Sequence, residues 1–72
     1  MAFAKIATWQ EVRGMADRGT YLWYQAPLDY SPVPVVARKL FKNGKIRISW
    51  AHGSFTADPG HLDRFRRRVE VA

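Results

Sequence analysis

The dipeptide Asn43-Gly44 constrains the fold of this chain more than any other feature of its sequence. It separates two runs of β-forming residues. Asn and Gly both tolerate positive φ, so this dipeptide between two such runs is the strongest short-range signal for a β-hairpin. A two-residue turn would place Phe41 opposite Ile46. The sequence therefore predicts a hairpin, and with it a β-sheet.

Alternation along the two predicted strands sorts their side chains into two faces. The face toward the core is predicted to hold the apolar residues, namely Val35, Ala37, Phe41, Ile46, Ile48 and Trp50. The other face is predicted to hold basic and polar residues around Leu40, namely Arg38, Lys42, Lys45, Arg47 and Ser49. Lys39 is the exception, because alternation points it inward. A β-bulge near Lys39, or a side chain that extends to solvent, would resolve this conflict.

A helix is predicted before the hairpin, over residues 9–18. Thr8 and Glu11 match the two ends of a capping box, in which each residue hydrogen-bonds to the backbone of the other. Apolar residues at helical spacing follow. Gly19 stands where a left-handed C-terminal cap is expected.

Further segments complete the predicted order of elements. Residues 1–7 are predicted to form a first strand or an arm that packs on the core, and residues 54–57 a short strand. Residues 20–25 are β-branched and aromatic, which favours a strand. Residues 26–34 contain three prolines and are predicted to form a loop. Asp followed by Pro suits the start of a helical turn near residues 59–65. Residues 69–71 are predicted to form a last strand.

The length and the order of elements predict one α+β domain over residues 1–72. From residue 20 to 71, a strand, a long loop, a tight hairpin, a helical turn and a final strand follow one another. With the segment Trp50–Leu62, this order resembles the SH3-like barrels. The resemblance implies a small β-barrel of about five strands, to which the N-terminal helix is an addition.

The basic charge of the second half predicts an acidic partner. Residues 38–72 carry nine basic and three acidic side chains, so they account for the whole net charge of +6. Nucleic acid is the simplest such partner. The residues predicted to contact its phosphates are Arg38, Lys42, Lys45, Arg47, Arg64, Arg66, Arg67 and Arg68. Strand neighbours alternate, so either Trp23 or Tyr24 must face outward, where its ring can stack on a base.

A protein-interaction module, such as a phage or plasmid accessory factor, is the alternative function. In this interpretation the contact residues are Trp23, Tyr24 and Tyr30, together with the proline-containing loop. Homodimerisation is a further option, because a chain this small builds only a thin core.

Catalysis, metals, cofactors and membranes are not expected. The two histidines, His52 and His61, have no cysteine or third histidine beside them in a metal-ligand pattern. The chain has some likeness to the small plasmid-type dihydrofolate reductases, but Ser54–Ala57 replaces the stretch that carries their active site. No apolar run approaches the length of a membrane span, so a cytoplasmic protein is expected.

Overall fold

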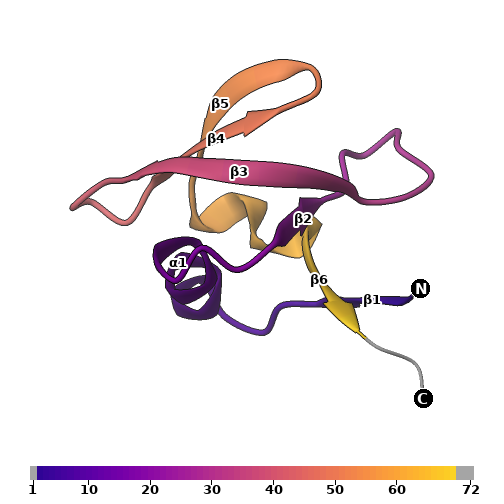
Figure 1. Ribbon diagram of the computed structural model, residues 1–72, viewed down its shortest axis with the longest axis horizontal. Helices are drawn as coiled ribbons and strands as arrows, with labels where there is room; N and C mark the ends of the chain where they lie inside the picture. Colours follow the sequence, from indigo (N-terminus) through magenta and orange to yellow (C-terminus); the bar gives the residue numbers. More distant parts are fainter. Residues whose placement is uncertain (1, 70–72) are drawn as a thin grey trace.

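The computed structural model describes residues 2–69, which form a six-stranded antiparallel sheet with one α-helix on it (Figure 1). The elements in chain order are β1 (Ala2–Lys5), α1 (Trp9–Asp17), β2 (Leu22–Tyr24), β3 (Val33–Leu40), β4 (Ile46–Trp50), β5 (Gly53–Ala57), the 3₁₀ helix η1 (Pro59–Arg64) and β6 (Phe65–Val69). The strands lie in the order β1-β6-β2-β3-β4-β5. Among residues 2–69, no helix is both long and apolar enough to cross a membrane.

The predicted α+β fold with a closed SH3-like barrel is wrong. The fold is mostly β, and the sheet is open, because β1 and β5 are its two edges and do not pair with each other in the described part of the chain. Residues 2–5 form a sixth strand, which pairs with β6 at the end of the sheet remote from β5. In Figure 1, α1 and η1 lie on the same side of β3. The sheet therefore packs on these helices and does not close on itself.

Both predicted helical segments are confirmed. The Thr8 hydroxyl accepts a hydrogen bond from the Glu11 amide at 3.2 Å, and α1 ends just before Gly19, whose φ is 71°. Asp58 caps η1, because its carboxylate accepts from the Gly60 amide at 2.8 Å. Local side chains therefore satisfy the first amides of both helices.

The core lies between the inner face of the sheet and α1. Its largest fully buried side chains are Phe65, Leu22, Ile46, Ile48 and Val12. Tyr24 is also buried, with its ring centroid 5.1 Å from those of Phe55 and Phe65 and 5.3 Å from that of Trp50. These are the separations at which aromatic rings attract one another edge to face. The aromatic residues thus join β2, β4, β5 and β6 on one side of the sheet.

The hairpin is present, but its predicted register is wrong, by one residue next to the turn and by two beyond the bulge. The Gly44 amide donates to the Phe41 carbonyl at 3.2 Å, and the Phe41 amide donates to the Lys45 carbonyl at 2.9 Å. The turn therefore contains three residues, and Gly44 takes the positive φ (93°) that this turn requires. Leu40, not Phe41, lies opposite Ile46. Leu40 packs against the core, whereas strand alternation predicted it on the basic face.

The predicted bulge near Lys39 is confirmed. The register of β3 against β4 shifts between Ala37 and Lys39, which leaves Arg38 as the extra residue. The shift returns Ala37 to the core side opposite Ile48 and puts Lys39 on the other side, opposite Arg47. The conflict at Lys39 is thus resolved by backbone geometry.

Two predicted boundaries also change. The loop predicted over residues 26–34 ends earlier, because β3 begins at Val33 and Pro34 pairs with Trp23. The last strand begins earlier than residue 69, at Phe65, and reaches Val69. The rest of the predicted strand, residues 70 and 71, lies outside the described residues.

Candidate nucleic-acid interface

The face of the sheet turned away from α1 forms three rows of paired side chains. Residues directly opposite each other on paired strands project to the same side. The first row crosses four strands and contains Lys5, Arg66, Trp23 and Pro34. The second contains Val36, Ser49 and Ser54, and the third contains Lys39, Arg47 and Thr56. The pair Phe3 and Arg68 lies beside the first row, two residues along β1 and β6, and we call these twelve residues the outer face.

Sequence spacing shows that the three rows belong to one face. Pro34 and Val36 are two residues apart on β3, and Arg47 and Ser49 are two apart on β4. Residues at this spacing in a strand point to the same side. The residue between Pro34 and Val36 is Val35, which is buried on the opposite side.

All the charged side chains of the outer face are basic. It holds five cations, Lys5, Lys39, Arg47, Arg66 and Arg68, whereas strands β1–β6 contain no acidic residue. The carboxylate of Asp63, on η1, lies 3.7 Å from the Lys5 ammonium. Both side chains are largely exposed to solvent, so this ion pair contributes little. The face therefore keeps a positive potential that attracts anions.

Arg47 is held in position by the neighbouring strand. Its guanidinium donates to the Ser54 hydroxyl at 2.9 Å and to the Thr56 hydroxyl at 3.2 Å. Both partners are uncharged hydroxyl groups, so these hydrogen bonds hold the guanidinium across β5 without placing a carboxylate beside it. A guanidinium fixed in this way matches the planar geometry of phosphate recognition.

The other cations of the outer face lie near β6. Arg66 is partly buried, and its guanidinium donates to the backbone carbonyls of Phe65, at 2.9 Å, and Asp63. Arg68 and Lys5 are exposed. This end of the face thus combines one anchored cation with two exposed ones.

Two aromatic side chains lie among these cations. The rings of Phe3 and Trp23 are 4.9 Å apart between centroids, and both are partly exposed. They contact each other across β6, from β1 and β2. Tyr21, two residues before Trp23, is 79% exposed. The outer face therefore offers aromatic as well as cationic contacts.

The structure brings only three of the eight predicted phosphate contacts onto this face, namely Arg47, Arg66 and Arg68. Lys42 and Lys45 are exposed at the hairpin turn, which lies at the other end of the molecule from β1 and β6 (Figure 1). The turn is held on α1, because the Trp9 indole donates to the Gly44 carbonyl at 2.5 Å and Arg13 donates to the Phe41 carbonyl at 2.9 Å.

The remaining three predicted contacts are dispersed. Arg38 is the exposed bulge residue, and it borders a hollow that also contains Asp17. The Arg64 guanidinium lies 3.4 Å from the Tyr24 hydroxyl, to which it donates. Arg67 is opposite Ala4 and therefore points to the side of the sheet that carries α1. The two predicted basic clusters do not form one surface.

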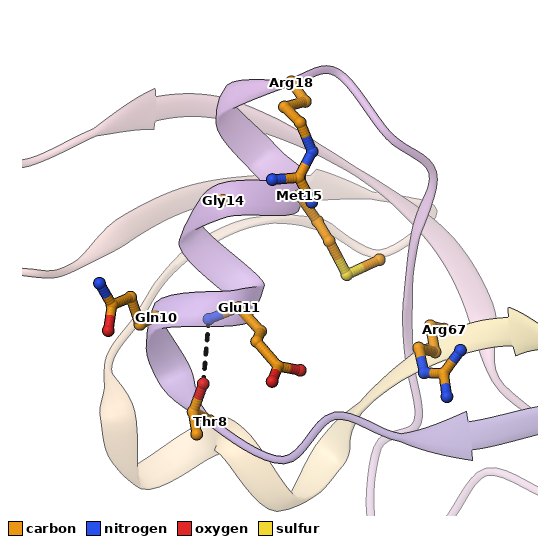
Figure 2. Close-up of a pocket in the computed structure, with 7 residues that line it drawn as sticks. All are labelled: Thr8, Gln10, Glu11, Gly14, Met15, Arg18 and Arg67. Carbon is orange, nitrogen blue, oxygen red and sulfur yellow. Dashed lines mark hydrogen bonds between the residues drawn. The ribbon is translucent and has the colours of Figure 1, made fainter.

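Arg67 borders an open hollow between α1 and β6 (Figure 2). Glu11 and Met15 project from α1 into this hollow, and Arg18 folds back along the helix over Gly14. The hollow thus combines one carboxylate with two guanidinium groups. Its hydroxyl group, on Thr8, accepts a hydrogen bond from the Glu11 amide and so caps α1.

Sequence reasoning missed Lys5 and Lys39 as members of the basic face. For Lys5 the missing information was the pairing of residues 2–5 with β6. For Lys39 the conflict with alternation was itself a signal, because a bulge moves the side chain outward.

The residues of the alternative, protein-interaction hypothesis lie in different environments. Trp23 is on the outer face, but Tyr24 is 4% exposed and belongs to the core. Tyr30 and its neighbour Leu28 are fully or almost fully exposed on the loop between β2 and β3. Tyr24 is therefore not accessible to a partner.

Comparison with known proteins identifies no relative of this chain. No family model matches the chain, and no curated protein or solved structure does. Within residues 2–69, no three His, Cys, Asp or Glu side chains gather as metal ligands. The functional interpretation therefore rests on the geometry and charge of the outer face.

Proposed function

We propose that this protein binds nucleic acid through the outer face of its sheet, mainly by contacts to phosphates. The observation that carries the proposal is the set of five cations on strands that contain no acidic residue. Phosphate contacts fix position on a nucleic acid but carry no sequence information, so we expect little sequence preference. Such a ligand fits the cytoplasmic location expected from the sequence.

The salt dependence of binding provides a quantitative test of the proposal. Each phosphate neutralised by a cation releases condensed counterions, so affinity falls as salt rises. If all five cations engage phosphates, log K against log salt has a slope of about −3.5 for a single strand and about −4.5 for a duplex. Binding without a salt dependence of this order would not involve the outer face.

Two double variants, each with two charge reversals in the same hairpin, test the location of the site. The double variant Lys39→Glu/Arg47→Glu removes an opposed pair on the outer face, and Lys42→Glu/Lys45→Glu removes two cations at the turn. Each double variant lowers the net charge from +6 to +2, so the two proteins differ only in where the charge changes. The two variants are therefore matched in net charge.

Fluorescence anisotropy with labelled DNA and RNA oligonucleotides, at about 50 and 200 mM salt, measures the outcome. We expect Lys39→Glu/Arg47→Glu to weaken binding strongly and to reduce the steepness of the salt dependence by about 2. The turn variant should bind much more like the wild type. Equal losses in both variants would contradict a site on the outer face, and no binding by the wild type at about 50 mM salt would refute nucleic-acid binding altogether.

A further inference from the structure

The aromatic pair on the outer face has no role in the core. Phe3 lies opposite Arg68 and Trp23 lies opposite Arg66, so each ring has a cation beside it on β6. The indole nitrogen of Trp23 has no hydrogen-bond acceptor among the described residues. This nitrogen is buried, so the nitrogen edge of the indole faces the protein and the exposed part of the ring lies elsewhere on it.

A duplex does not use such a surface. Its bases are stacked on one another, so it offers a protein phosphates and the edges of bases. A single strand exposes the faces of unstacked bases, and aromatic side chains on a sheet stack on them while nearby cations hold the backbone. The Phe3–Trp23 pair, with Arg66 and Arg68 on the strand between the two rings, suits a single strand.

We infer that the ligand of the outer face is single-stranded nucleic acid, with a base stacked on the Phe3–Trp23 pair. This inference rests on the proposed function and specifies its ligand. Arg66 and Arg68 hold the phosphates on either side of the stacked base.

The rest of the outer face provides a path for the strand. From Pro34 to Lys39 along β3 the chain covers about 16 Å, at roughly 3.3 Å per residue. The row of the outer face between these points, Val36, Ser49 and Ser54, is uncharged, and Val36 is 53% exposed. The path ends at Lys39 and Arg47, a second pair of cations. The strand thus contacts cations at both ends of the face and apolar or hydroxyl groups between them.

Binding of single and double strands by the full chain tests this inference. The probes are labelled oligothymidylate and oligouridylate of about twelve nucleotides and a duplex of the same length. The variants are Trp23→Leu, which removes the aromatic ring, and Trp23→Phe, which keeps one. Tyr30→Leu is the matched control, because Tyr30 is an exposed aromatic residue on a loop.

We expect the single strands to bind more tightly than the duplex. Trp23→Leu should weaken single-strand binding about 5- to 100-fold, the usual effect of losing a stacked ring. Trp23→Phe should restore most of the affinity, and Tyr30→Leu should leave it unchanged. Tighter binding of the duplex, or no effect of Trp23→Leu in a protein that remains folded, overturns the inference while nucleic-acid binding itself stands. If the protein binds neither the single strands nor the duplex, the proposed function is refuted as well.

Photochemical cross-linking of the wild type decides the matter if Trp23→Leu does not fold. A bromouracil-substituted single strand is irradiated with the protein, and the modified peptide is identified by mass spectrometry. Cross-links at Phe3 or Trp23 support the inference. Cross-links confined to the hairpin turn or to the hollow beside α1 contradict it.

Discussion

Leu40→Ala and Phe41→Ala distinguish the two possible registers of the β3–β4 hairpin. In the structure Leu40 lies opposite Ile46 and packs against the core, and Phe41 begins the turn. A two-residue turn would reverse these roles and bury Phe41. The variant that destabilises the protein more therefore identifies the register.

The expected magnitudes follow from burial. Truncation of a buried leucine to alanine costs about 2–5 kcal/mol, and the partial exposure of Leu40 places it at the lower end, about 2 kcal/mol. Phe41 loses the contact with the Lys39 ammonium, which lies 5.2 Å from its ring centroid. Such exposed cation–π contacts are worth about 0.5–1 kcal/mol. The backbone hydrogen bonds of Phe41 survive the substitution, so its total cost stays near 1 kcal/mol.

Urea and thermal unfolding, followed by circular dichroism, measure both variants. In a domain of this size, 1 kcal/mol corresponds to a shift in Tm of about 4–8 °C, so Leu40→Ala should lower Tm by roughly 8–16 °C. Phe41→Ala should lower it by about half as much. If Phe41→Ala costs the 3–5 kcal/mol typical of a buried phenylalanine, the three-residue turn is refuted.

Two glycines and one helix cap allow further predictions of stability. Gly14→Ala should stabilise the protein by up to about 1 kcal/mol, because alanine favours the helix and the new methyl group meets only the flexible end of Arg18. Gly44→Ala should destabilise it by about 1 kcal/mol or more, since its φ of 93° strains any side chain; a rise in Tm would contradict the turn geometry. Asp58→Ala removes the acceptor for the Gly60 amide and should cost about 1 kcal/mol in urea unfolding; an unchanged midpoint would show that the η1 cap contributes nothing.

The parts of the fold that follow from neighbouring residues were predictable. The start of α1 depends on Thr8 and the residue three positions later, and the start of η1 depends on Asp58 and the residues next to it. Alternation correctly separated Trp23 from Tyr24, one on each side of β2. These features involve contacts over a few residues, which a single sequence displays directly.

The candidate site was predictable only in part. The basic character of the second half was evident, but its grouping depends on which strands are neighbours. Lys5 reaches the outer face because β1 pairs with β6, and Lys39 reaches it because of the bulge in β3. Lys42 and Lys45 stay apart from that face, although they are closest in sequence to Arg47.

Long-range contacts set the turn length, the strand order and the position of the cations. The hydrogen bonds from Trp9 and Arg13 to the hairpin turn join residues 35 and 28 positions apart, and no local pattern encodes them. Local signals fixed where the hairpin would form, because positive φ at Gly44 is a property of that residue alone. The register also depends on which side chains fill the core, and burial of Leu40 and Ile46 against α1 and the sheet selected it.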